Sequence, residues 1–175
     1  MQTSKVSSNS KTKDLVQTAL LTALIFVSTY WIQFQLPFGG NGGLVHLGTA
    51  MLFISAIVFG KNKGGISAAI GMGLFDLVSG WGLWAPFTFV IKGSMAYLVG
   101  LIVYSKGREG NNVIVNIIAT FIAGVWMIAG YFLTNTFLSG NWATAVASIP
   151  GDITQIALGM IVGIPIAKVL KKFKI

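Results

Sequence analysis

Apolar residues along this chain form long runs, separated by short polar or glycine-rich segments. The runs cover residues 14–36, 44–60, 64–79, 86–104, 112–137 and 149–169. A helix needs about 20 mostly apolar residues to cross a bilayer, so the pattern predicts six spans, of which the second and third are short. The sequence therefore predicts an all-α integral membrane protein, folded as a compact bundle of six transmembrane helices.

Polar segments flank this apolar region at both ends. Residues 1–13 are rich in Ser and Lys, and residues 171–175 are basic. We expect 1–13 to be a disordered tail, because such a composition buries too little apolar surface to fold. The run from Leu15 is too long for a signal peptide and shows no clear cleavage site. It is therefore predicted to stay as the first span of a single membrane domain, 14–170.

Composition supports a membrane protein and excludes several chemistries. The chain is 54% hydrophobic and 9% charged, with a mean hydropathy of +0.79, whereas a soluble domain has about 25% charged residues. It has no cysteine, which excludes disulfides and thiolate metal sites. The motifs GxxxxGK[ST], HExxH and GxSxG are absent from the sequence, so nothing indicates that the chain hydrolyses ATP by itself or binds a metal.

The basic residues alternate from loop to loop. Eleven of the twelve Lys and Arg residues lie in residues 1–13, the turn at 61–63, the turn at 106–110 and residues 168–175. The loops 37–43, 80–85 and 138–148 have none. Since Lys and Arg are concentrated in cytoplasmic loops, the alternation predicts six spans with both termini cytoplasmic.

A few polar residues stand out within or beside the apolar runs. They are His46, Asp76, Lys92, Asn135 and Asp152. In the predicted topology all of them lie in the outer third of the bundle, at the level of Trp81 and Trp84. An ionisable side chain at a membrane helix centre costs about 2.5–3.5 kcal/mol, so such residues indicate a functional site. We predict a polar pocket open to the outside and roofed by the three uncharged loops.

Each of these residues also has a structural interpretation. Asp76 and Lys92 could form a salt bridge that joins the third and fourth spans, or Lys92 could snorkel outwards. The tryptophans could form only an interfacial belt. His46 could cap the second span, and Asp152 could be an N-terminal residue of the sixth span favoured by the helix dipole.

The chemistry of the predicted pocket favours the capture of a small solute. Aromatic faces suit a planar ring, and two carboxylates against one ammonium disfavour a dianion such as a phosphate ester. Ion conduction requires polar residues through the full depth of the bundle, and the inner half lacks them, so the chain needs a partner for transport. An intramembrane enzyme using His46 and the carboxylates, and a stand-alone facilitator, remain alternatives.

Residues 39–100 contain a characteristic run: His46, Asp76, Trp84, Pro86 and Lys92. The first span carries an A-x-x-x-A stripe at Ala19 and Ala23. With six short spans, these features resemble the S components of energy-coupling factor (ECF) vitamin transporters, most closely the subfamily linked to hydroxymethylpyrimidine and pyridoxine uptake. The resemblance covers nearly all of residues 14–170.

This resemblance implies a prokaryotic cell-membrane protein that binds one vitamin under its outer loops and is not an enzyme. It implies that Ala19 and Ala23 dock on a membrane coupling subunit, which carries two ATPase subunits that use ATP. It also implies that the whole S component topples in the membrane during transport. No cofactor is expected on this chain. The pocket residues implied are His46, Asp76, Trp84, Lys92, Asn135 and Asp152, with Trp81 or Trp84 stacked on the ring. Hydroxymethylpyrimidine or pyridoxine is the first expectation; riboflavin or thiamine is the alternative.

Overall fold

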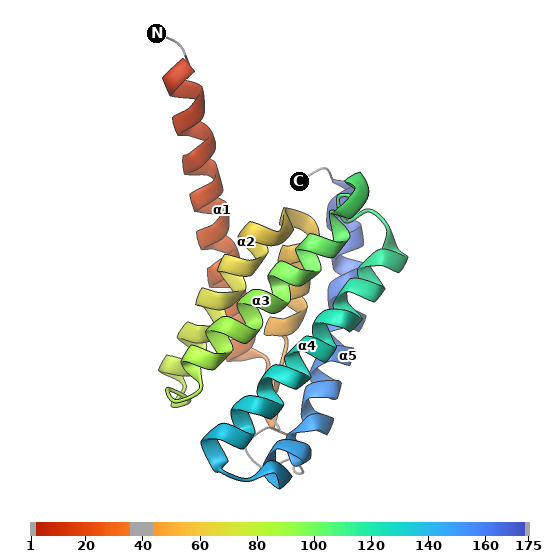
Figure 1. Cartoon of the computed structure of the whole chain (residues 1–175). Coiled ribbons are helices and arrows are strands. Elements are labelled where there is room, and N and C mark those ends of the chain that lie inside the picture. Colours follow the sequence, from red (N-terminus) through yellow and green to blue (C-terminus); the bar gives the residue numbers. More distant parts are fainter. Residues whose placement is uncertain (1–2, 36–43, 174–175) are drawn as a thin grey trace.

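A computed structural model describes residues 3–35 and 44–173 of the chain (Figure 1). Over these ranges the protein forms five α-helices and one short hairpin. The helices are α1 (Thr3–Trp31), α2 (Gly48–Val78), α3 (Ala85–Val103), α4 (Val113–Ser139) and α5 (Trp142–Lys172). Strands β1 (Gln33–Gln35) and β2 (Leu44–His46) pair antiparallel, and a 3₁₀ turn covers Ser105–Gly107. The prediction of a helical protein is confirmed, but the hairpin was not expected.

Helix α2 covers both the second and the third expected span. Its backbone leaves the helical conformation at Gly60, where φ is 84° and ψ is 179°, a region that glycine adopts without steric cost. A Cβ on Gly64 would lie 2.7 Å from the Cα of Ala56, whereas eight residues of straight helix would separate them by about 12 Å. Helix α2 therefore folds back on itself as two limbs, residues 48–59 and 61–78 (Figure 1). The expected count of six helices is not confirmed, because the reversal leaves no loop between the limbs.

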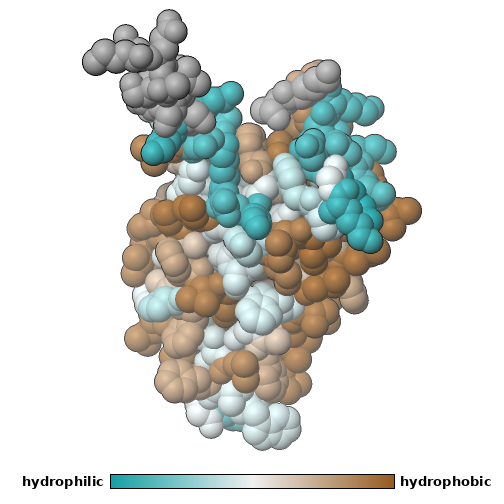
Figure 2. Space-filling model, turned by 45° about the horizontal axis from the view of Figure 1, so that its top comes forward, coloured by the Kyte–Doolittle hydropathy of each residue, from teal (hydrophilic) through white to brown (hydrophobic). Residues whose placement is uncertain are grey.

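In the part of the chain that the structure describes, four helical segments are long and apolar enough to cross a membrane: Lys11–Trp31, Ala85–Val103, Val113–Ser139 and Trp142–Lys172. Figure 2 shows apolar residues spread widely over the surface, with hydrophilic residues gathered toward one end. Both termini lie at one end of the molecule (Figure 1), as an even number of crossings requires. That this end faces the cytoplasm stays a prediction.

Two helix boundaries differ from the predicted ones. Helix α1 begins at Thr3, so the backbone expected to be disordered over 1–13 is mostly helical; extending a formed helix adds one hydrogen bond per residue and avoids a new nucleus. Helix α5 begins at Trp142, where the side chain of Asn141 accepts a hydrogen bond of 2.9 Å from the Ala143 N–H. Pro150 therefore lies inside α5. The interpretation of Asp152 as a helix N-terminal residue is wrong.

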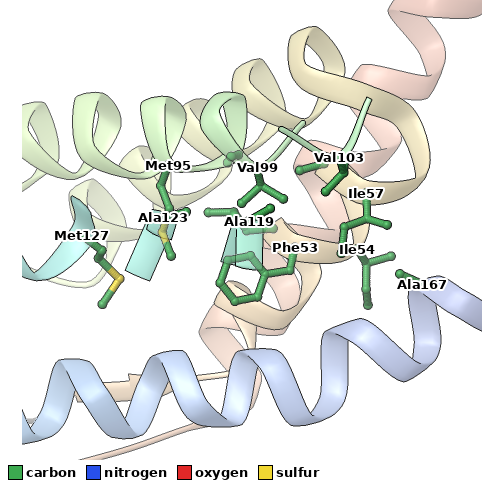
Figure 3. Close-up of a cluster of buried hydrophobic side chains, with 14 of the residues drawn as sticks. Phe53, Ile54, Ile57, Met95, Val99, Val103, Ala119, Ala123, Met127 and Ala167 are labelled. Atoms are coloured by element: carbon green, nitrogen blue, oxygen red, sulfur yellow. The ribbon is translucent and has the colours of Figure 1, made fainter. Parts of the chain in front are cut away.

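The core fills the middle of the bundle with apolar side chains that range in size from alanine to phenylalanine (Figure 3). Phe53 and Ile57 of α2 lie against Val99 of α3, and Ala123 of α4 and Ala167 of α5 are fully buried in the same cluster. Small residues at such positions let helix backbones approach closely. Both ends of the bundle are left to polar groups.

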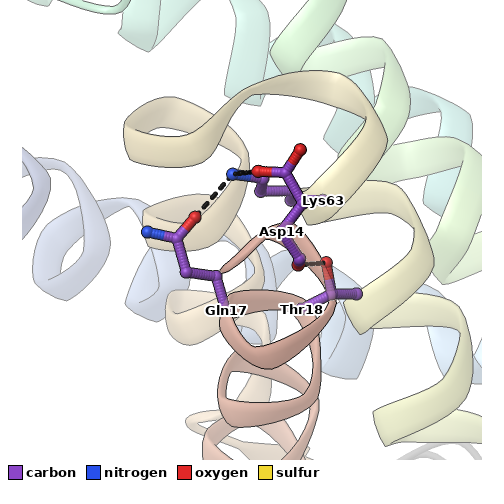
Figure 4. A network of polar contacts seen from close by, with 4 residues as sticks. All are labelled: Asp14, Gln17, Thr18 and Lys63. Atoms are coloured by element: carbon purple, nitrogen blue, oxygen red, sulfur yellow. Dashed lines mark hydrogen bonds and ion pairs between the residues drawn. The ribbon is translucent and has the colours of Figure 1, made fainter. Parts of the chain in front are cut away.

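Helix α1 is fastened to the second limb of α2 by a small polar network (Figure 4). Lys63 Nζ lies 2.7 Å from Asp14 Oδ1 and donates to Gln17 Oε1 at 2.5 Å. One turn further along α2, Ser67 Oγ donates to the carbonyl of Thr18 at 3.0 Å. These contacts fix the height of α1 against the bundle.

We expect Lys63→Met to lower the melting temperature by only about 2–4 °C. A partly exposed ion pair contributes up to about 1 kcal/mol, and in a chain of this size 1 kcal/mol shifts the melting temperature by about that amount. Thermal unfolding in detergent checks this, with Lys106→Met on an exposed turn as the control. A fall of more than about 10 °C would show that the network does more than hold α1.

Candidate functional site

A cavity opens at the end of the bundle away from the two termini, between β2, the end of α2 and helices α3 to α5. The cavity volume is about 80 Å³, and the surrounding empty space, which includes solvent at the open mouth, is about 610 Å³. The lining residues are Thr29, Leu44, His46, Met72, Phe75, Asp76, Trp81, Trp84, Thr88, Tyr131, Asn135, Asp152 and Gln155. Six of the seven predicted binding residues are among them, and Lys92 is not.

Two carboxylates line this cavity from different helices. Asp76 lies in the last turn of α2 and is 8% exposed, and Asp152 lies in α5 and is 7% exposed. Within the described residues only Lys63 and Asp14 form an ion pair shorter than 4.0 Å. The salt bridge considered between Asp76 and Lys92 is therefore not formed, and both carboxylates are free of a cation in contact with them.

Lys92 lies behind the cavity wall and is 1% exposed. Its ammonium donates to Thr49 Oγ1 at 3.2 Å and contacts Met127 Sδ at 3.0 Å. The side-chain amide of Gln155 is oriented so that its oxygen accepts a hydrogen bond from Lys92 Nζ at 3.0 Å. Its nitrogen donates to the Leu44 carbonyl at 3.3 Å. The alternative in which Lys92 snorkels outwards is wrong, because these groups hold its charge inside the bundle.

His46 is the last residue of β2, and it bonds to the same Gln155 oxygen as Lys92. Its Nε2 lies 2.9 Å from Gln155 Oε1 and donates to it, so Nδ1 is an acceptor, and this atom has no partner in the described part of the chain. In a neutral imidazole that is protonated at Nε2, the open valence at Nδ1 is an acceptor.

The two tryptophans lie on the link between α2 and α3. The Trp81 N–H donates to the Asp76 carbonyl at 2.9 Å, and the Trp84 N–H donates to the Trp81 carbonyl at 2.8 Å. This tight turn places both half-buried indoles in the cavity wall next to Asp76. Their position in the wall does not fit a purely interfacial belt, whereas Trp31 is 80% exposed.

Helix α4 completes the wall opposite the link. Tyr131 Oη donates to Thr88 Oγ1 at 3.2 Å, and its ring centroid lies 5.5 Å from Lys92 Nζ, within the range of a cation–π contact. Asn135 Nδ2 donates to Ser148 Oγ at 3.0 Å. These contacts fix the side chains of α4 toward α3 and α5.

The sequence-based prediction missed Gln155 and Thr88. Gln155 follows Asp152 by three residues and Thr88 precedes Lys92 by four, so both lie on the same helix face as a residue that was singled out. The loop 37–43, expected to roof the pocket, lies outside the described residues. In the described chain no three His, Cys, Asp or Glu side chains are close enough to hold a metal ion.

The predicted docking residues do not line this cavity. Ala19 and Ala23 are exposed on α1, next to exposed Leu20 and Leu24. The small residues thus face outward and are not used in packing within the bundle. Their role in docking stays a prediction.

Comparison with known proteins gives a consistent picture. A family model described as "ECF-type riboflavin transporter, S component" matches residues 9–172. The thiamine precursor transporter HmpT of Lactococcus lactis subsp. cremoris (strain MG1363) is 30% identical over 166 residues, 95% of this chain and 90% of the relative. An uncharacterized protein of Pyrococcus woesei is 33% identical over 148 residues, 85% of this chain and 95% of the relative.

Two solved structures share the fold. The S component of a bacterial ECF transporter superposes with a TM-score of 0.76 at 22% identity, covering 93% of this chain and 98% of that one. The S component for biotin from an ECF-type ABC transporter has a TM-score of 0.57 at 17% identity, covering 94% and 93%. At these identities the likeness concerns the fold alone.

Proposed function

This chain belongs to the S-component family of ECF-type vitamin transporters, and on that premise we propose that it captures hydroxymethylpyrimidine or pyridoxine from outside the cell. The family is one of membrane transport subunits, not of enzymes. In our proposal the cavity under the 79–84 link is the binding site, Trp81 or Trp84 stacks on the ring, and Asp76 and Asp152 accept hydrogen bonds from its amino or hydroxymethyl groups.

The observation that carries this choice of ligand is the excess of acceptors in the cavity. Asp76 and Asp152 bring two carboxylates, and neither has a cation within 4.0 Å. His46 Nδ1 and Asp152 Oδ2 have no partner among the described residues, and a buried acceptor without a donor costs about 1–3 kcal/mol. The ammonium of Lys92 is already bonded to Thr49 and Gln155. A ligand rich in N–H and O–H donors and free of negative charge complements such walls.

The size of the cavity favours a single ring. A water needs about 10–15 Å³ by the same measure, so 80 Å³ holds on the order of five waters. A hydroxymethyl-substituted pyrimidine or pyridine fills that space, whereas a three-ring flavin extends through the mouth. Riboflavin is kept as the second candidate, because the matching family model is described by that ligand.

Lys92 acts in this proposal as a positioning residue. Its contact with Gln155 fixes the amide whose other end reaches Leu44 in β2 and whose oxygen holds His46. The charge of Lys92 also partly offsets the two carboxylates through the protein interior. The side chain thereby sets the shape and potential of the site without touching the ligand.

Uptake requires partners that this chain does not contain. We propose that Ala19 and Ala23 dock on a membrane coupling subunit with two ATPase subunits, which supply the ATP-driven step. Co-purification of these subunits with the chain from a host that expresses all of them tests the docking, and its loss in Ala19→Trp is the expected result. Retention of the complex in that variant would contradict the assigned surface.

Ligand binding to the detergent-purified chain, followed by quenching of its own tryptophans, tests the proposed function. We expect saturable quenching by hydroxymethylpyrimidine or pyridoxine at nanomolar to low micromolar concentration, and at least 100-fold weaker binding of riboflavin, thiamine and biotin, because a buried polar group left unpaired by the wrong ligand discriminates strongly. Tighter binding of riboflavin would favour the second candidate. Silence across the panel from folded protein would contradict both.

A further inference from the structure

A second polar cavity lies at the opposite end of the bundle, between the start of α4 and the end of α5. Its volume is about 210 Å³, and it is lined by Gly110, Asn111, Val113, Asn116, Lys168, Lys171 and Lys172. This is the end at which both chain termini lie (Figure 1) and toward which hydrophilic residues gather (Figure 2). Nothing in the proposed function uses this cavity.

The charge in this cavity is positive and uncompensated. Lys168 and Lys172 are exposed and Lys171 is half-buried, and within the described chain none of them lies within 4.0 Å of a carboxylate. Glu109, the acidic residue just before Gly110, does not line the cavity. The first turn of α4 adds backbone N–H groups and the positive end of a helix dipole.

Lys171 is held in place by an aromatic side chain. Its Nζ donates to Tyr104 Oη at 3.2 Å and lies 5.2 Å from the ring centroid. Tyr104 Oη in turn donates to the Val58 carbonyl at 2.7 Å. The ammonium is thus fixed by Tyr104, which is itself bonded to Val58 of α2, and it keeps further N–H donors for a ligand.

Asn116 is the second, independent sign of a ligand. It is 1% exposed, its Nδ2 donates to the Gly110 carbonyl at 2.9 Å, and its Oδ1 has no partner in the described part of the chain. An amide oxygen does not attract a phosphate, so a ligand that satisfies it brings a hydroxyl donor as well as an anionic group.

We infer that this cavity binds the headgroup of an anionic membrane lipid that carries both a phosphate and a hydroxyl, of the phosphatidylglycerol type. The phosphate lies among Lys168, Lys171 and Lys172 at the first turn of α4, and a headgroup hydroxyl donates to Asn116 Oδ1. Basic pockets between membrane helices near the cytoplasmic surface suit such headgroups.

The surface next to the cavity suits the acyl chains of the same lipid. Ile117 of α4, next to Asn116 in the sequence, and Val169 of α5, next to Lys168, are large apolar side chains that are 44% and 51% exposed. Helices α4 and α5 pack side by side in the fold. A free phosphate would gain nothing from this surface, which is why we assign the site to a lipid.

Native mass spectrometry of the detergent-purified chain tests this inference with defined lipids. We expect phosphatidylglycerol to be retained over phosphatidylcholine, and the variant Lys168→Gln/Lys171→Gln/Lys172→Gln to lose roughly 100-fold in affinity, at about fivefold for each lysine near an anionic headgroup. The matched control removes the same charge elsewhere, as Lys11→Gln/Lys13→Gln/Lys106→Gln, and should retain the lipid. Tryptophan quenching by the vitamin ligand verifies that each variant is folded.

Several results would overturn the assignment. Equal losses in the two triple variants would mean that net charge alone attracts the lipid. Displacement of phosphatidylglycerol by millimolar inorganic phosphate would point to a plain anion site. Equal retention of phosphatidic acid, which lacks the headgroup hydroxyl, would remove the role of Asn116.

Discussion

Replacing Asp76 with Ala abolishes measurable binding of hydroxymethylpyrimidine, and replacing it with Asn weakens binding by roughly 10- to 150-fold. A hydrogen bond to a charged group contributes about 1.5–3 kcal/mol, which corresponds to that range. Asn keeps the shape of the side chain and one acceptor, whereas Ala also opens a gap beside Trp81 and Trp84. The measurement is quenching of intrinsic tryptophan fluorescence by the titrated ligand.

The fold should survive both substitutions at this position. Asp76 forms no ion pair shorter than 4.0 Å with a described residue, and a carboxylate that is 8% exposed is costly to desolvate. We therefore expect the melting temperature without ligand to stay the same or to rise. The control is Asp14→Asn, which removes a carboxylate that does not line the cavity and should leave affinity unchanged. Unchanged affinity of Asp76→Ala would contradict its assignment to the ligand.

Replacing Gly100 with Ala destabilises the protein by about 3 kcal/mol, the upper part of the usual range for overpacking. A Cβ at this position of α3 would lie 2.4 Å from both the Cα and the backbone nitrogen of Lys61. These are backbone atoms at the reversal of α2, so no side chain can rotate away. The reversal and α3 would have to separate, which also disturbs Tyr104 beneath Gly60.

The sign of this effect makes it a sharp test of the α2 reversal. Gly→Ala inside a helix ordinarily stabilises by about 0.8–1.0 kcal/mol, so a straight α2 far from Gly100 would predict a gain. We expect the melting temperature to fall by roughly 6–12 °C. Gly82→Ala is the matched control, since a Cβ there meets no atom within 4 Å. Equal melting temperatures for the two variants would contradict the close contact.

The membrane spans and the alternation of charged loops could be predicted from the sequence, because both depend on residues that are neighbours in the chain. Predicted spans 86–104 and 112–137 correspond closely to α3 and α4, since each run ends at turn residues that are local in the chain. The cavity residues were also predictable in kind, because a charge inside an apolar run is costly wherever the chain folds. His46, Asp76 and Asp152 do line one cavity.

The partners of those residues were decided only by the tertiary structure. The sequence placed Lys92 beside Asp76, yet its hydrogen bonds reach Thr49, 43 positions away, and Gln155, which a different helix supplies. Whether α2 is one helix or two depends on the contact of Gly64 with Ala56 and of Lys61 with Gly100, which no local propensity encodes. The sequence by itself therefore determined a helical membrane protein with a polar, aromatic site at one end. The packing of distant helices decided which charges line the cavity, because a long side chain such as Lys92 reaches whichever acceptors the fold brings near it.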